Sequence, residues 1–385
     1  MPYATGRTFL DADSHIMELP DFLTANADRD IADKLPVFNF EAAGVLAQHV
    51  SNYAGAGRPA QEAQQLRDLG DSLISGPKGY DALGAFDASE RTDALDRLGF
   101  TKQLVFSSLS TSMLFGDTLD PDIACGGCRA HNRSMAEFCA DNRLVGVGLL
   151  PIDDVERAIK DLDYAMSLGL EAMWIPHRLA NGHSPGHTDL DPLWARFVEH
   201  DVPFLLHVGG AALKVEPGWL ENGRPIPGNW LGGGENFRSK DMMGLHHLPE
   251  QFLSTMVLDG VLERFPALRG GVIELGAGWV PSMLARLDLV AGIWSRSEPL
   301  LKDMQRRPSQ QIIDQIRFTP FVFEDVGAII NTSDPSLYLF SSDYPHPEGG
   351  RDPLGRFSRT LEGQDEETLD RFYTRNFADL MGMNA

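Results

Sequence analysis

Eight short apolar runs, separated by amphipathic stretches, constrain the fold of this chain more than any other feature. Several of the runs are continuously apolar rather than alternating, which is typical of parallel strands buried on both faces. Strands that alternate with helices predict a parallel sheet, and eight such units favour a closed (β/α)₈ TIM barrel over an open sheet. The predicted strands are 8–13, 102–107, 144–150, 172–176, 203–208, 270–275, 316–321 and 337–342.

The stretches between these runs carry helix start and stop signals. Asp153 and Asp154 precede an amphipathic stretch that ends at Gly169, so a capped helix is expected there. Pro192 stands in the first turn of another predicted helix that begins near Asp191. Two further helices are expected over 249–265 and 281–293.

Two long segments exceed the minimal strand–helix repeat. Residues 21–91 are rich in Ala, Gly and Gln and predict an inserted helical layer after the first strand. Residues 209–245 follow the fifth strand and carry Gly, Pro and two Trp residues. Long segments of this kind in a compact domain are usually lids or binding loops. No linker divides the 385 residues, so a single barrel domain over 1–385 with these two insertions is expected.

Charge and composition exclude several classes of function. The chain has 33 Lys and Arg against 55 Asp and Glu, and a formal net charge of −22 argues against binding to nucleic acid or to anionic lipid. Three cysteines do not make a disulfide framework, and no run of 18 apolar residues or apolar leader is present. We therefore expect a cytoplasmic protein whose partner is a small organic molecule.

Polar side chains follow the predicted strands where the mouth of a parallel barrel would lie. Asp13 and His15 are two residues apart, so on an extended strand they point to one face. His207 ends the fifth predicted strand and Asp343 follows the eighth. A mixed set of imidazole and carboxylate ligands suits Zn²⁺, and also Mn²⁺ or Fe²⁺. Taken singly, each is more often a hydrogen-bonded polar residue or a helix cap than a ligand; together they predict a metal site.

These motifs resemble the amidohydrolase superfamily. The stretches DADSH (11–15), FLLHVGG (204–210) and SSDYPHPEGG (341–350) look like its amidohydrolase-2 branch, which contains aminocarboxymuconate-semialdehyde decarboxylase and γ-resorcylate decarboxylase. Supporting stretches are GVLERFPALRGG (260–271), GWVPSMLARLD (278–288) and RFTPFVFED (317–325). The resemblance implies a distorted barrel that holds one divalent ion, most simply zinc, and a homodimer is common in the family.

The resemblance also assigns residues to the metal. Its first-strand motif is His-x-His or Glu-x-His, and those positions are Asp13 and His15 here. The remaining ligand positions fall on His207 and Asp343. No Lys follows the fourth predicted strand, so a bridging carbamylated lysine and a second metal are not expected.

Further candidates surround this set. Asp343 is predicted to move a proton, and Glu274 stands where the family often has a catalytic His after the sixth strand. His247 is a third catalytic candidate, against the alternative of a polar residue in a helix-start loop. His177 and Arg178 are candidate substrate ligands, although Arg178 also fits a structural salt bridge. His346 is a candidate for orienting Asp343 or contacting substrate.

Two reactions and one non-catalytic role remain open from these residues. Because the sixth-strand His is missing, the sequence analysis favours a hydrolase in which metal-activated water attacks a carbonyl of an amide, lactone or related compound. The alternative is a metal-dependent non-oxidative decarboxylase of an aromatic or unsaturated carboxylic acid. A metal-free barrel that only binds a ligand is the third possibility, and metal analysis of the purified protein distinguishes it from the other two.

Overall fold

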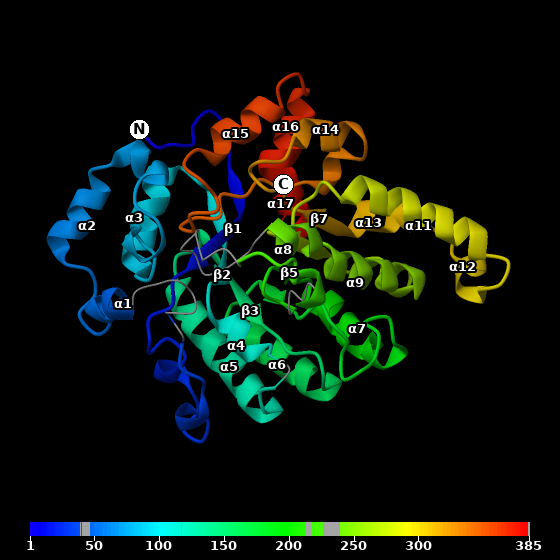
Figure 1. The fold of residues 1–385 in the computed structure, drawn as a ribbon, viewed down its shortest axis with the longest axis horizontal. Helices are drawn as coiled ribbons and strands as arrows, with labels where there is room; N and C mark the ends of the chain where they lie inside the picture. Colours follow the sequence, from blue (N-terminus) through cyan, green and yellow to red (C-terminus); the bar gives the residue numbers. More distant parts are fainter. Residues whose placement is uncertain (39, 41–46, 117, 212–216, 226–238, 384–385) are drawn as a thin grey trace.

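Seven parallel strands form one curled sheet at the centre of the molecule (Figure 1). The computed structural model describes residues 1–38, 40, 47–116, 118–211, 217–225 and 239–383. Each strand pairs with the next in sequence, and this order confirms the predicted TIM-barrel-like α/β fold. The strands are β1 (Leu10–Ile16), β2 (Lys102–Ser107), β3 (Leu144–Leu149), β4 (Ala172–Trp174), β5 (Phe204–His207), β6 (Gly270–Ile273) and β7 (Ile316–Phe318).

The predicted eighth strand, 337–342, is not a regular strand. Its backbone still lies between β7 and β1, because Leu339 N donates to Phe318 O (2.9 Å) and Ala12 N donates to Phe340 O (3.0 Å). Two other backbone N–H groups of this segment donate to acceptors outside β7 and to a side chain of β1. Phe340 N donates to Phe372 O at 2.9 Å, and Ser342 N donates to the Asp11 carboxylate at 2.7 Å. The segment thus connects the two edges of the sheet without a continuous ladder.

Helices surround the sheet, and the predicted helices after Asp154, from Asp191 and near Pro281 are among them. Those up to β5 are α1 (Ala47–Tyr53), α2 (Ala60–Arg67), α3 (Ala88–Leu98), α4 (Ser110–Leu114), α5 (Pro121–Phe138), α6 (Val155–Ser167) and α7 (Asp191–His200). Those after β5 are α8 (Ser239–Gly244), α9 (His247–Leu258), α10 (Val261–Arg264), α11 (Val280–Trp294), α12 (Pro299–Asp303), α13 (Pro308–Gln315), α14 (Val326–Asn331), α15 (Pro353–Thr360), α16 (Glu366–Asp370) and α17 (Asn376–Met381).

Local sequence signals explain where several helices begin and end. The Asp154 carboxylate accepts a hydrogen bond from Arg157 N and caps α6, as predicted. The single helix expected over 249–265 is wrong, because the chain forms α9 and α10 instead. Gly260 between them has a φ of 74°, a left-handed conformation that ends a helix and that glycine adopts without strain.

The first insertion contributes α1, α2 and the start of α3, and these helices lie together on one side of the sheet (Figure 1). Its hydrogen bonds to the barrel mouth include one from Gly79 N to Pro345 O at 2.8 Å and one from Tyr80 OH to Glu18 O at 2.7 Å. In the second insertion the structure describes a short turn at Pro217–Trp219 and α8; positions 212–216 and 226–238 lie outside the described residues. None of the helices described here has the length and apolar character that a membrane span needs.

Candidate metal centre and active site

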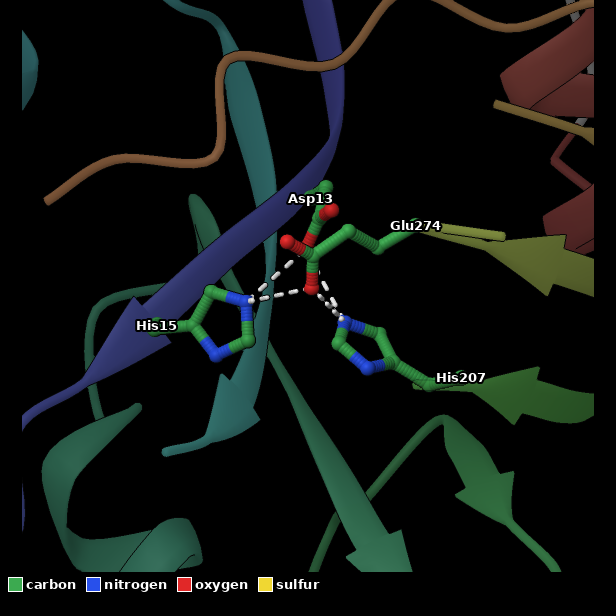
Figure 2. Close-up of side chains that lie close together, drawn as sticks. All are labelled: Asp13, His15, His207 and Glu274. Atoms are coloured by element: carbon green, nitrogen blue, oxygen red, sulfur yellow. Dashed lines mark hydrogen bonds and ion pairs between the residues drawn. The ribbon is translucent and has the colours of Figure 1, made fainter. Parts of the chain in front are cut away.

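Four buried side chains converge at the carboxyl ends of β1, β5 and β6 (Figure 2). They are Asp13, His15, His207 and Glu274, and one ligand atom from each lies within 4.8 Å of all the others. Asp13 Oδ1 is 3.2 Å from His15 Nε2 and 3.4 Å from His207 Nε2. Glu274 Oε2 is 3.5 Å from His207 Nε2 and 4.0 Å from His15 Nε2. We call these four residues the metal cluster.

Hydrogen bonds at the far ring nitrogens prepare both imidazoles to bind a cation. His15 Nδ1 lies 3.1 Å from Ser107 O, and His207 Nδ1 lies 2.9 Å from Val208 O. A carbonyl oxygen can only accept, so each Nδ1 must carry the proton. Each Nε2 then presents a lone pair to the cluster, which is the usual arrangement of a metal-binding histidine.

The electrostatics of the cluster fit a divalent cation. Burial lowers the pKa of His15 to about 4, and the nearby His346 lowers it too, so His15 is neutral at pH 7. Burial raises the pKa of Asp13, but its interactions with the adjacent His15 and His207 outweigh burial and hold that pKa below its usual value. Among the described residues, His15 Nε2 has no hydrogen-bond partner although it is buried. Two carboxylates and two imidazoles, including the buried and unpartnered Nε2 of His15, form a donor set for Mn²⁺ or Zn²⁺.

Strained backbone supports two of the carboxylates at this mouth. Glu274 and Asp343 both have a φ of 53°, which costs a non-glycine residue about 1–3 kcal/mol. The conformation is held at Glu274 by a hydrogen bond from its N to Thr319 Oγ1 (2.8 Å), and at Asp343 by one from its N to Asp13 O (2.8 Å). Strain of this kind is concentrated at functional sites, because the surrounding fold must compensate for it.

Asp343 belongs to a second group that overlaps the metal cluster. Its Oδ1 lies 3.5 Å from His15 Nε2 and 3.2 Å from His346 Nδ1, and the rings of His15 and His346 stack with centroids 3.9 Å apart. The structure therefore groups Glu274, rather than Asp343, with the other three predicted ligands. The sequence predicts a catalytic role for Glu274 and no role as a metal ligand.

The geometry around Asp343 and His346 suits a shared proton. Ser108 Oγ donates its hydrogen to Ile16 O at 2.8 Å, so at its 2.7 Å contact with His346 Nε2 it must accept. His346 Nε2 is then protonated, and a neutral imidazole would present a bare Nδ1 to Asp343 Oδ1 at 3.2 Å. Two lone pairs at that distance repel, and a proton on the carboxyl or on Nδ1 would turn this contact into a hydrogen bond. The arrangement can therefore accommodate an exchangeable proton beside the metal cluster.

The structure places the other predicted residues less centrally. His177 is buried near His207, and burial lowers its pKa to about 3. Arg178 makes two hydrogen bonds to the Asp153 carboxylate, at 2.7 and 2.9 Å, which matches the structural salt bridge considered for it. His247 is exposed at the start of α9 and is not among the residues that gather at the metal cluster, so the structure does not bring this catalytic candidate to the site.

Sequence analysis missed two supporting residues. Ser108 directly follows β2, and a serine after a predicted strand of a parallel barrel was a detectable signal. Asp11 accepts hydrogen bonds from Ser342 N (2.7 Å), Ser342 Oγ (2.6 Å) and Gln103 Nε2 (2.7 Å), and burial raises its pKa to about 7. It joins β1 to the eighth segment, and only the fold reveals that role.

Comparisons with known proteins agree with this geometry. Residues 15–382 match the family model described as amidohydrolase. Decarboxylase orsB of Emericella nidulans is 26% identical over 331 residues, which cover 83% of this chain and 87% of that protein. Among solved structures, an amidohydrolase of Mycobacterium avium subsp. paratuberculosis K-10 is 19% identical, with a TM-score of 0.74 over 98% of this chain and all of that one. The 5-carboxyvanillate decarboxylase of Novosphingobium aromaticivorans, complexed with manganese and 4-hydroxy-3-methoxy-5-nitrobenzoic acid, is 18% identical, with a TM-score of 0.63 over 99% of both chains.

These comparisons correct the expectation of hydrolysis. The curated relative is a decarboxylase, and the neighbour that holds a metal and an aromatic acid is a decarboxylase as well. The reason that favoured hydrolysis, the missing sixth-strand His, also loses its force, because the geometry groups Glu274 with the predicted ligands. The family model spans nearly the whole chain, and it confirms the expected enzyme class: the chain belongs to the amidohydrolase family, in its amidohydrolase-2 branch.

Proposed function

We propose that this chain is a metal-dependent non-oxidative decarboxylase of an aromatic carboxylic acid. The observation that carries the proposal is the juxtaposition of the metal cluster with the proton-holding pair of Asp343 and His346. Decarboxylation needs both elements, because an anionic substrate must be held while a proton is delivered to the carbon that loses CO₂. The decarboxylase relatives support the choice of reaction.

Asp13, His15, His207 and Glu274 would hold the ion. The sequence analysis expected zinc, and the donor set admits it. Two carboxylates among four ligands suit manganese equally, and the manganese in the related decarboxylase favours that ion. When bound, a divalent ion supplies positive charge that holds substrate oxygens and stabilises negative charge on them.

The side chains account for the proton and the departing carboxylate. The proton shared by Asp343 and His346 passes to the ring carbon that bears the carboxylate. The bond between that carbon and the carboxylate then breaks, its electron pair returns to the ring, and CO₂ leaves. The pair regains a proton from water, and Ser108 keeps the His346 ring oriented throughout by the 2.7 Å contact to Nε2.

His177 is retained as a proposed substrate contact, together with its neighbour Trp174. Neither His177 Nδ1 nor Trp174 Nε1 has a hydrogen-bond partner among the described residues, and both atoms are buried. A Cβ at Gly210 would lie 2.7 Å from Trp174 Nε1 and 2.9 Å from His177 Nδ1, so both nitrogens face the glycine that follows β5. An oxygen of the substrate brought to this position would satisfy them.

The test is release of CO₂ from a panel of hydroxylated and methoxylated benzoic acids by protein loaded with Mn²⁺ or with Zn²⁺. We expect a product that lacks the carboxylate and, in heavy water, carries one deuterium at that carbon. A His207→Ala variant serves as the metal-site control and should release no CO₂. Stoichiometric water incorporation into a carbonyl product, or equal turnover by His207→Ala, would contradict the proposal.

A further inference from the structure

Lys78 and Glu348 form a second polar pair beside the active site, on the side of Asp343 and His346. Both ends of the pair are buried. Among the residues that the structure describes, neither the Lys78 ammonium nor either Glu348 carboxylate oxygen has a hydrogen-bond partner, and the two groups do not bond to each other. Buried charges without partners are costly, so their retention needs a reason.

Backbone contacts fix the position of both residues. Gly79 N donates to Pro345 O at 2.8 Å, and this bond presses the Lys78 segment of the first insertion onto the loop after the eighth segment. The Lys78 ammonium lies 5.5 Å from the centre of the Tyr344 ring. That loop doubles back, since a Cβ at Gly349 would lie 2.1 Å from Ser342 O and 3.0 Å from Asp343 Cβ. Gly349, the residue after Glu348, is therefore packed against Asp343.

The charges of these groups influence one another. Burial lowers the pKa of Lys78 to about 8, while the charges of Asp343 and Glu348 act in the opposite direction. Burial likewise raises the pKa of Glu348, with His346 opposing it. The ammonium and the carboxylate thus share one electrostatic environment with the proton-holding pair, without a direct bond between them.

A hydroxyl group is the chemical partner that satisfies both residues. Its oxygen accepts from an ammonium, which is only a donor, and its hydrogen is donated to a carboxylate, which is only an acceptor. We propose that Lys78 and Glu348 receive a ring hydroxyl of the substrate and thereby select phenolic acids with a hydroxyl at one particular ring position. This inference rests on the proposed function, and it adds two specificity-determining residues to the site.

The experiment measures binding and turnover of matched acids by manganese-loaded protein. The parent compound is 2-hydroxybenzoate, and the probes add one hydroxyl to give the 2,4-, 2,5- and 2,6-dihydroxy isomers. We expect one isomer to bind at least about tenfold more tightly than the parent, because a site built to hydrogen-bond a hydroxyl discriminates against the compound that lacks it. Lys78→Met and Glu348→Leu should abolish that preference while changing the Kd of the parent less than about twofold, and Glu348→Gln, which keeps an acceptor, should retain part of it.

Lys102→Met is the matched control. Lys102 Nζ donates to Asn142 O, and the residue begins β2 at the opposite end of the sheet from the site, so the ligand preference should persist in this variant. Melting temperatures of the metal-free variants provide a second readout. Lys78→Met removes no hydrogen bond and should not lower the melting temperature, whereas loss of a structural ion pair would lower it.

Several outcomes overturn the inference: an unchanged preference in Lys78→Met, an equal loss of affinity for every acid, or no isomer bound more tightly than the parent. These outcomes are distinguishable from failure of the proposed function. Selective binding that Lys78→Met abolishes, but without CO₂ release, rejects the decarboxylase and leaves the hydroxyl site standing. CO₂ release with identical selectivity in wild type and both variants rejects the hydroxyl site and leaves the decarboxylase proposal standing.

Discussion

Replacing Glu274 and Asp343 one at a time should separate metal binding from catalysis. In Glu274→Gln the metal cluster loses one of its two negative charges, at a site where Oε2 lies 3.5 Å from His207 Nε2 and 4.0 Å from His15 Nε2. A unit charge at about 4 Å contributes about 4 kcal/mol at an effective dielectric constant of about 20. The amide oxygen recovers part of this, so we expect a loss of about 1.4–4 kcal/mol, or about ten- to thousandfold in the Kd for Mn²⁺.

Asp343→Asn should behave differently. In the proposed mechanism Asp343 and His346, whose side chains are 3.2 Å apart, share a proton, so a neutral amide changes little in the net charge near the cluster. We expect the Kd for Mn²⁺ to change less than about fivefold while CO₂ release falls by at least about a hundredfold, the scale of general acid catalysis. Competition with a chromogenic chelator gives the first quantity and saturating-metal turnover the second. Equal metal loss in both variants, or full activity in Asp343→Asn at saturating metal, would refute the division of roles.

Three further perturbations test the site and the fold. Ser108→Ala removes the 2.7 Å contact to His346 Nε2, and turnover should fall about 10- to 100-fold with metal content unchanged; normal turnover would remove Ser108 from the mechanism. Chelation should lower the melting temperature of the wild type, since Mn²⁺ at 100 times its Kd stabilises by about 2.7 kcal/mol, but should not shift that of His207→Ala. Buried His131 has a pKa lowered to about 4 by burial, against about 6.5 in an unfolded chain. The unfolded state alone binds this proton between those values, so about 3 kcal/mol of stability, present above pH 6.5, is lost as pH falls toward 4. Denaturant unfolding should show a shallower loss in His131→Asn, and an identical slope would count against the buried neutral imidazole.

The sequence predicted the strands well where they are buried on both faces, because continuous apolar runs have few alternative interpretations. β2 occupies 102–107 as expected. The eighth run does not form a regular strand, because a side chain and a distant backbone carbonyl accept hydrogen bonds that a neighbouring strand would otherwise accept. Asp11 takes the amide of Ser342, and Phe372 takes that of Phe340. A linear sequence shows apolar character, but it does not show which acceptor binds each backbone N–H group.

The candidate site divides in the same way. Asp13, His15 and His207 stand at strand ends, and parallel topology alone brings such residues to one mouth. Lys78 lies in the first insertion and carries no periodic signal; the hydrogen bond from the next residue, Gly79 N, to Pro345 O brings it to the loop that follows Asp343. His247 illustrates the opposite failure. A histidine pair before a helix suggested a catalytic imidazole, but the turn of α9 leaves this side chain in solvent.

The absence of a sixth-strand His argues against decarboxylation only if position 274 must deliver the proton. Glu274 instead lies with the predicted ligands Asp13, His15 and His207, and its Oε2 is 3.5 Å from His207 Nε2. In the proposed mechanism the exchangeable proton lies between Asp343 and His346, where the Ser108 hydroxyl fixes the tautomer. In the proposed mechanism the carboxylate at 274 binds the metal, while the carboxyl–imidazole pair at 343 and 346 supplies the proton. Such a mechanism does not require an imidazole after β6, because the proton comes from Asp343 and His346.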